Sequence, residues 1–371
     1  MGLGTIAILL AGIVALVGGA EALVRGAARL AARTGMSSVV IGLTIVAFGT
    51  SAPELAVSVG DALRGGDDAG AIAIGNVVGS NIANVLLVLG LAAAVGGSLF
   101  VAQRIVRLDV PLMIGASVLV LIFVLDERLS RVEGVILLIA LAVYVTWTVV
   151  AATKGSTPDI VTQYDEALDE LDGDNLNPAP VYADIGFLVL GLALLVFGSQ
   201  ALVSSASNIA TELGVSDLVI GLTVVAIGTS LPEVATSVLA AIRGQLDIAV
   251  GNAIGSNLFN LLAVLGTSAV VSPKAIPVAA SAVQVDIPVM LAVAVACLPI
   301  FANGHVLSRW EGIAFLFGYA GYLIWLVLDA TDQGARDTYG DVAVFFVVPA
   351  VALTIATLWY RGRADDPAEL R

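Results

Sequence analysis

Two glutamates in apolar, helix-length segments are the residues best placed to bind ions. Glu54 and Glu233 each follow a proline, in the segments GTSAPE and GTSLPE, and no lysine or arginine lies at comparable depth to pair with either carboxylate. An ionised carboxylate at the centre of a bilayer costs at least about 2.5 kcal/mol unless it is paired. We therefore interpret both carboxylates as ligands of mobile cations. Permanent protonation of both side chains is the structural alternative.

The residues before each glutamate supply further oxygen atoms. A proline inside a helix removes a backbone donor and disturbs the carbonyl four residues back. We therefore expect the helices to open around Ala47–Thr50 and Ala226–Thr229. The same segments contain four hydroxyl residues: Thr50, Ser51, Thr229 and Ser230. Calcium binds roughly six to eight oxygens from carboxylates, carbonyls and amides, and this inventory supplies them.

A second pair of segments, GSNIAN and GSNLFN, adds a serine and an asparagine to each half of the chain. Ser80 and Asn84 are four residues apart, and therefore lie on one face of a helix. Ser256 and Asn260 repeat this pair. Because an intramembrane amide needs a partner, we favour ion coordination over helix packing for these four residues.

Other repeated polar or small residues have structural interpretations. Close helix packing accounts for two glycines, Gly79 and Gly255. Hydrogen bonds between helices are expected for four amides: Asn76, Asn81, Asn252 and Asn257. Capping boxes, with the pattern S-x-x-E before an apolar run, are predicted at Ser130/Glu133 and Ser308/Glu311. N-caps of two further helices are predicted at Asp109 and Asp286, each two residues before a proline.

These residues recur because the sequence is duplicated. IGLTIVAFGTSAPELAVSVGDALRG, at 41–65, corresponds to IGLTVVAIGTSLPEVATSVLAAIRG, at 220–244. Hydropathy predicts five helices in each copy: 3–32, 38–63, 70–97, 108–126 and 131–152, then 181–211, 216–242, 246–271, 285–303 and 309–328. Five is an odd number, so the second copy must enter the membrane upside down.

The predicted fold is an all-α membrane protein with two inverted five-helix repeats, hence ten core transmembrane helices, and an eleventh C-terminal helix over 341–360. We divide the chain into a first repeat (1–152), an acidic cytoplasmic linker (153–180), a second, inverted repeat (181–330) and a C-terminal helix with its tail (331–371). With the N-terminus outside, most of the 16 Lys and Arg residues fall in inner segments. We therefore expect a multi-pass protein of the cell membrane with its N-terminus outside.

Composition supports a membrane protein and argues against an enzyme. The chain is 59% hydrophobic and 12% charged, with a mean hydropathy of +1.02, whereas soluble domains carry about 25% charged residues. The single cysteine, Cys297, excludes an intramolecular disulfide, and the single histidine, His305, leaves little material for a histidine metal site. Neither an H-E-x-x-H nor a G-x-S-x-G motif occurs in the sequence.

The doubled motifs GTSAPE/GTSLPE and GSNIAN/GSNLFN resemble the two signature repeats of the sodium/calcium exchanger family, within the calcium/cation antiporters, over about residues 1–330. The resemblance implies exchange of Ca²⁺ for Na⁺, with both ions competing for a site around Glu54 and Glu233. It implies a ligand set: the carbonyls of Ala47, Thr50, Ala226 and Thr229, the hydroxyls of Ser51, Ser80, Ser230 and Ser256, and the amide of Asn84. Where several family members carry an aspartate, this chain has Asn260, which removes one titratable group.

Two other functions stay open. A proton-coupled or potassium-dependent calcium/cation antiporter would use the same ligands, although the proton-coupled branch shows GN-x-x-E where this chain has GTS-x-PE. A cation channel would use these oxygens as a filter. Inverted repeats favour alternating access. We expect Ca²⁺, Na⁺ and the lipid bilayer as partners, with no resident cofactor and no nucleic acid.

Overall fold

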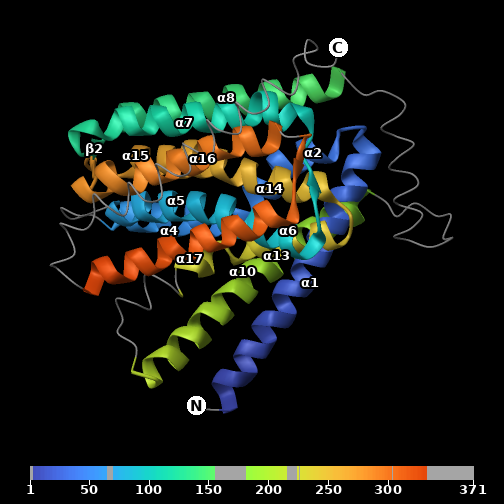
Figure 1. Cartoon of the computed structure of the whole chain (residues 1–371), viewed down its shortest axis with the longest axis horizontal. Coiled ribbons are helices and arrows are strands. Elements are labelled where there is room, and N and C mark those ends of the chain that lie inside the picture. The colour runs from blue at the N-terminus through green and yellow to red at the C-terminus, as the bar shows by residue number, and fades with distance from the viewer. Residues whose placement is uncertain are drawn as a thin grey trace, which may run out of the picture.

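The structure, a computed structural model, describes residues 3–64, 70–154, 181–214, 224, 226–302 and 304–331. The predicted helix at 341–360, residues 155–180 of the predicted linker and the start of the predicted helix 216–242 lie outside these residues. The described chain is mostly helical, and most helices form one bundle (Figure 1). Two long helices, α1 (Leu3–Thr34) and α10 (Val181–Glu212), lie side by side and project obliquely from that bundle (Figure 1).

The remaining segments follow a similar order in the two halves. In the first half they are α2 (Ser38–Ile41), η1 (Gly42–Val46), α3 (Ala47–Thr50), α4 (Ala52–Leu63), α5 (Ala71–Ala83), η2 (Asn84–Leu89), α6 (Gly90–Gly96), η3 (Ile105–Asp109), α7 (Val110–Phe123), η4 (Val124–Asp126) and α8 (Arg131–Lys154). In the second half they are α12 (Ala226–Thr229), α13 (Leu231–Ile242), α14 (Leu246–Phe259), η6 (Asn260–Val264), α15 (Leu265–Val271), η7 (Ala282–Asp286), α16 (Ile287–Ala302) and α17 (Arg309–Thr331). The η segments are π-helical turns, except η4, which is a 3₁₀ turn.

Two short antiparallel strand pairs connect the halves. β1 (Leu99–Phe100) pairs with β4 (Val306–Leu307), and β2 (Arg128–Leu129) pairs with β3 (Ile276–Pro277). In each pair, the loop between the third and fourth helices of one half is hydrogen-bonded to the loop between the fourth and fifth helices of the other. These two loops must therefore lie at the same end of the bundle.

The predicted helix 38–63 is bent rather than continuous. Eight helices in the described part of the chain are long and apolar enough to cross a membrane, and the bent pair Ser38–Thr50 with Ala52–Leu63 makes a ninth. The two members of this pair differ in direction by 44°. The predicted openings over Ala47–Thr50 and Ala226–Thr229 are misplaced, because these residues form α3 and α12 and the breaks fall at Ser51 and Ser230. Proline follows in the first turn of α4, where its missing N–H would be unpaired in any helix.

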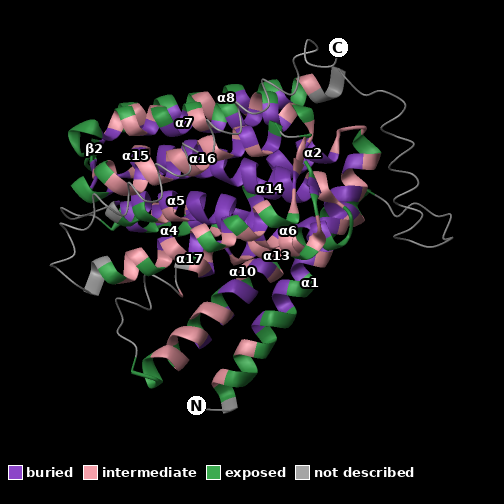
Figure 2. Cartoon of the chain, viewed as in Figure 1, coloured by how far each residue is buried: buried purple, intermediate pink, exposed green. Residues whose placement is uncertain are grey.

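The centre of the bundle is formed by the third helix of each half. The span Leu246–Val271 is almost entirely buried, and the span Ile72–Gly96 is mostly buried. Figure 2 shows this contrast between the buried α14 and the exposed outer parts of α1 and α10. The most conformationally constrained positions for an ion site are therefore on α5 and α14 and on the broken helices packed against them.

Both predicted capping boxes are confirmed. The backbone N–H of Ser130 donates to Glu133 Oε2 at 2.7 Å, and the N–H of Glu133 donates to Ser130 Oγ at 3.4 Å. Ser308 and Glu311 form the same two bonds at 2.8 and 3.4 Å. These reciprocal bonds fix where α8 and α17 begin.

The predicted N-cap roles of Asp109 and Asp286 are wrong. Asp109 is the last residue of η3, so the helix already runs through it, and it makes no capping bond. Its buried carboxylate instead accepts a hydrogen bond from Tyr144 at 3.1 Å and forms an ion pair with Arg104 at 3.5 Å. Asp286 likewise ends η7, and it hydrogen-bonds Tyr322. A π-helical turn before the proline replaces the helix start that the sequence pattern suggested.

Helices α1 and α10 pack antiparallel through glycines. A Cβ atom at Gly19 would lie 2.8 Å from Gly191 O, and one at Gly12 would lie 3.0 Å from Gly198 O. Small residues at such spacings allow two membrane helices to approach closely. The contacts run along much of both helices, so α1 and α10 form one unit.

Replacing Gly191 with alanine is expected to destabilise the protein by about 1–3 kcal/mol, the usual cost of overpacking. The new Cβ would lie 2.6 Å from Leu23 N and 2.8 Å from Gly19 O, and backbone atoms inside helices cannot move aside. The measurement is the apparent Tm of the purified protein. Gly186→Ala on the same helix is the control, because nothing lies within 4 Å of its Cβ position. Equal melting of the two variants would show that the glycine contacts do not hold α1 against α10.

Candidate functional site

Each helix break places a glutamate in the first turn of a new helix. Glu54 lies in the first turn of α4, and Glu233 lies in the first turn of α13. The N-terminus of a helix carries a partial positive charge from its unpaired N–H groups, and each carboxylate lies near its own backbone N–H. Both side chains are fully buried, so solvent does not screen either carboxylate.

Asparagines on the third helix of each half hold the broken helices in place. Asn76 on α5 donates to the backbone carbonyl of Glu54 at 3.2 Å, and Asn252 on α14 donates to that of Glu233 at 3.4 Å. Each amide also donates at 3.0 Å to a serine one turn after the glutamate: Ser58 and Ser237. The predicted interhelical bonds of Asn76 and Asn252 are confirmed. The role of the two serines was missed, although both halves show the pattern E-x-x-x-S.

Hydroxyl groups connect the glutamates to α5 and α14. Ser80 donates to Glu54 Oε1 at 3.4 Å. Thr50 donates to Asn252 Oδ1 at 3.0 Å, and its hydroxyl lies 3.3 Å from that of Ser256. The predicted site residues Thr50, Ser80 and Ser256 therefore lie together around the break in the first half.

Residues from the first half also reach the glutamate of the second. Thr50 and Ser51 lie next to the Glu233 carboxylate. Ala47, one turn earlier, accepts a backbone hydrogen bond from Ser51 at 3.0 Å. In the second half, Ala226–Thr229 form α12, which packs against α5. That the carbonyls of these segments bind ions stays a prediction.

The asparagines of the GSNIAN and GSNLFN segments form a quartet between α5–η2 and α14–η6. Asn84 donates through Nδ2 to Asn257 Oδ1 at 3.0 Å, and Asn260 donates through Nδ2 to Asn81 Oδ1 at 3.1 Å. Asn81 and Asn257 each donate to the backbone carbonyl of the other at 3.3 Å. The predicted interhelical bonds of Asn81 and Asn257 are confirmed, and these bonds turn out to involve the candidate ligands directly.

Several buried oxygen atoms of the predicted site residues have no hydrogen-bond partner among the described residues. They are Ser51 Oγ, Glu54 Oε2, Asn84 Oδ1, Ser230 Oγ, both carboxylate oxygens of Glu233, and Asn260 Oδ1. A buried polar atom without a partner costs about 1–3 kcal/mol, and native proteins tolerate few of them without a reason. All of these atoms can coordinate a hard cation, and each belongs to a residue in the predicted site.

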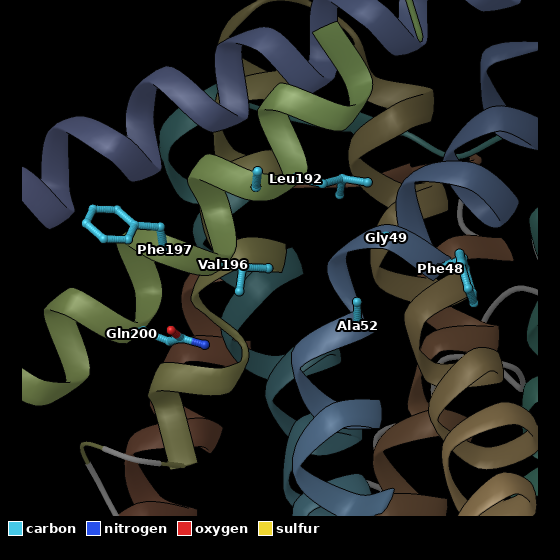
Figure 3. Close-up of a pocket in the computed structure, with 8 residues that line it drawn as sticks. Phe48, Gly49, Ala52, Leu192, Val196, Phe197 and Gln200 are labelled. Carbon is cyan, nitrogen blue, oxygen red and sulfur yellow. The ribbon is translucent and has the colours of Figure 1, made fainter. Parts of the chain in front are cut away.

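The two sides of the site are packed differently. On one side α1 packs against α13, and Thr236 is fully buried. On the other side Val57, the residue that corresponds to Thr236 in the repeat, is 44% exposed. A pocket of about 440 Å³ lies there between α10 and the segment α3–α4. In Figure 3, Leu192 and Val196 of α10 face Ala52 across this pocket, one residue from Ser51.

An ion pair bridges the tightly packed side. Arg243, just after α13, lies 2.9 Å from Glu21 of α1, and Arg25 of the same helix lies 2.6 Å from that glutamate. The residues that correspond to Glu21 and Arg243 in the repeat are Gln200 and Arg64. An amide cannot form an ion pair with arginine, so the chain has this bridge on one side only.

Comparison with known proteins adds independent support. The sequence profile of the family described as sodium/calcium exchanger protein matches residues 4–150 and 184–328. CaxA of Alkalimonas amylolytica is 40% identical over 290 residues, which cover 77% of this chain and 87% of that protein. The sodium/calcium exchanger MaX1 of Methanosarcina acetivorans is 35% identical over 317 residues, covering 78% of this chain and 89% of that protein. A solved structure of the sodium-calcium exchanger NCX_Mj, soaked with Na⁺ and Sr²⁺, superposes with a TM-score of 0.71 at 30% identity, covering 86% of this chain and 97% of that one.

Proposed function

The chain belongs to the sodium/calcium exchanger family, and from this premise we propose that it exchanges Ca²⁺ for Na⁺ across the membrane by alternating access. It is a multi-pass membrane transporter and not an enzyme. Both ions compete for one site around Glu54 and Glu233. The other ligands are drawn from Ala47, Thr50, Ser51, Ser80, Asn84, Ala226, Thr229, Ser230, Ser256 and Asn260.

The observation that carries this proposal is the set of buried oxygens without hydrogen-bond partners. Two buried carboxylates are balanced by one Ca²⁺ or by two or more Na⁺. The unpartnered hydroxyl and amide oxygens beside them are neutral and hard, which suits both ions. An empty site leaves two unpaired buried charges. Reorientation without an ion is then costly, and that cost favours exchange over leak.

The arrangement of the two halves supports inverted repeats. If both halves ran in the same direction, the loop after the third helix of one half and the loop after the fourth helix of the other would lie at opposite ends of the bundle and could not pair. The β1–β4 and β2–β3 pairs join such loops, and α1 runs antiparallel to its counterpart α10. Inverted repeats place the site between the halves and allow each half to gate one side.

The unequal packing beside the site supports a transporter with one open and one closed side. The pocket next to Ala52 lies beside the site, between the middle of α10 and the start of α4. The opposite side is closed by α1 against α13. With the N-terminus outside, as the distribution of basic residues favours, the ends of α4 and α10 face outward and the Glu21–Arg243 ion pair lies on the cytoplasmic side.

The proposed exchange is tested by calcium uptake into vesicles that contain the purified protein. Uptake driven by an outward sodium gradient is the expected result. Uptake that follows a pH gradient and ignores sodium would assign the chain to proton-coupled antiport, and a requirement for potassium would assign it to the potassium-dependent type. Calcium current without any counter-ion would indicate a channel.

Replacing Glu21 with glutamine is expected to shift the protein toward the state in which α10 closes on α4. The variant loses the ion pair that bridges α1 and α13, whose side chains are 24% and 43% exposed. Partly exposed pairs are weak, so the population ratio should change by about two- to fivefold. The measurement is the distance distribution between spin labels at two exposed residues, Leu63 at the end of α4 and Leu213 just after α10, in a Cys297→Ala background. The short distance should become more populated.

Arg25→Gln is the matched control for this experiment. It removes the other partner of Glu21, but that pair lies within α1 and moves with the helix. The distance distribution should not shift toward the short form. A shift of the same size in both variants would mean that the bridge to α13 does not set the balance between the two states.

A further inference from the structure

We propose that Asn81 and Asn257 are positioning residues, which orient the side-chain amides of Asn84 and Asn260 so that their Oδ1 atoms, and not their NH₂ groups, face the cation. This inference rests on the proposed function and assigns a role to two asparagines that are not themselves ligands. All four side chains are buried, with at most 2% exposure.

A ligand amide can adopt two orientations, and only one of them favours ion binding. Oxygen and nitrogen of an asparagine side chain have nearly the same shape, and a half-turn of the amide exchanges them. A cation is attracted by the oxygen and repelled by the NH₂ group. A site amide therefore binds ions well only if something else holds its NH₂ group on the far side.

The quartet does this for both amides. The Nδ2 atom of Asn84 is held by Asn257 Oδ1 at 3.0 Å, and that of Asn260 is held by Asn81 Oδ1 at 3.1 Å. The Oδ1 atoms of Asn84 and Asn260 are left buried and without a partner. Turning either amide around would place two oxygen acceptors against each other and expose an NH₂ group to the ion.

The two holding amides are themselves fixed. Asn81 Nδ2 donates to the backbone carbonyl of Asn257, and Asn257 Nδ2 donates to that of Asn81, each at 3.3 Å. A flip of either side chain would lose this bond. Each site amide is thus oriented by an asparagine of the other half of the chain, and not by its own neighbour in sequence.

The same geometry specifies an amide at position 260. A carboxylate there would place an oxygen about where Asn260 Nδ2 now donates to Asn81 Oδ1. Two acceptors cannot share that position without turning Asn81 and breaking its bond to Asn257. The chain's asparagine at 260, where several family members carry an aspartate, is therefore matched to Asn81.

Double-mutant cycles on calcium affinity test the inference, because they detect which pairs act together. The dissociation constant is measured by calorimetry on the purified full-length protein. Asn257→Ala should weaken binding by about 10- to 100-fold, as losses of residues that orient metal ligands do. Asn84→Ala should have a similar effect, and the double variant should be no weaker than Asn84→Ala alone. Asn81→Ala should be coupled to Asn260→Ala in the same way.

The decisive controls are the two pairs of asparagines that are neighbours in sequence. Asn81 with Asn84, and Asn257 with Asn260, are neighbours on their helices, and general damage to a helix would couple them. The proposal requires instead that the two substitutions of a neighbouring pair act independently, so that the fold-losses of calcium affinity in the single variants multiply in the double variant. Coupling that follows sequence neighbours, or an unchanged affinity in Asn257→Ala, would overturn it.

A conservative variant at position 257 distinguishes loss of this orienting bond from misfolding of the alanine variant. Asn257→Asp keeps an acceptor for Asn84 and loses the donor to Asn81, so Asn84→Ala should still cause its full loss of affinity in that background. If Asn84→Ala causes no loss there, Asn257 does not orient Asn84. A wild-type protein that binds neither Ca²⁺ nor Na⁺ would instead contradict the proposed function.

Discussion

Replacing either Glu54 or Glu233 with glutamine is expected to abolish calcium transport and to weaken calcium binding by about 100-fold or more. Affinity for Ca²⁺ depends strongly on the number of charged ligands, and the site has two. Glutamine keeps the shape of the side chain and removes one of the two charges. The measurements are the calcium dissociation constant and sodium-driven uptake into vesicles.

The same variants should be at least as stable as the wild type when no ion is bound. Both carboxylates are fully buried, and a buried charge without a partner is costly. Removing one of these charges removes that cost, so the apparent Tm of the ion-free protein should stay level or rise. A stabilised protein that no longer binds calcium identifies a ligand and not a structural residue. Near-normal exchange by either variant would eliminate the proposed site.

Glu133→Gln is a matched control for these two changes. Glu133 belongs to the capping box of α8, where glutamine can also accept the capping bond. Calcium affinity and uptake should be unchanged in this variant. A loss equal to that of Glu54→Gln would show that removal of any glutamate impairs the protein.

Replacing Asp184 with alanine is expected to destabilise the protein by about 3 kcal/mol, at the lower end of the cost of breaking a buried ion pair. Asp184 on α10 is fully buried and lies 2.5 Å from Arg33 and 3.9 Å from Arg29, both on α1. Without its carboxylate, two partly buried guanidinium groups lose their counter-charge at the α1–α10 contact. The apparent Tm of the purified protein is the measurement.

Gln200→Ala on the same helix is the control for Asp184. Its side chain is exposed at the pocket, so its loss should change the apparent Tm little. If Asp184→Ala and Gln200→Ala have the same apparent Tm, the ion pairs do not contribute to holding α1 against α10. The glycine contacts would then carry that association alone.

The position of the candidate site could be predicted from the sequence because the duplication marks it twice. A carboxylate without a basic partner in an apolar segment is expensive, and finding it at the same place in both copies excludes chance. The serine and asparagine of GSNIAN and GSNLFN, four residues apart, must share a helix face whatever the fold. Local patterns also located the two capping boxes, which depend on bonds within one turn.

The sequence misled where a pattern had two structural solutions. An aspartate two residues before a proline can begin a helix, but in this chain a π-helical turn carries the helix through Asp109 and Asp286. The proline before Glu54 could be assigned to a helix break, but not to the break at Ser51, because the packing of α3 against α14 decides which residues stay helical.

The sequence by itself therefore predicted a cation site around Glu54 and Glu233 and showed that the chain consists of two related, largely apolar halves. Only the tertiary structure decided how these halves serve each other. Asn84 is held by Asn257, Asn260 by Asn81, and Thr50 and Ser51 lie beside Glu233. The two sides of the site also differ, with Glu21 bridged to Arg243 and no equivalent charge at Gln200. Helical periodicity and the cost of burying a charge depend on the residues of a single segment, so they can be predicted from its sequence. Contacts between segments some 170 residues apart depend on how the helices cross, which the local pattern does not encode.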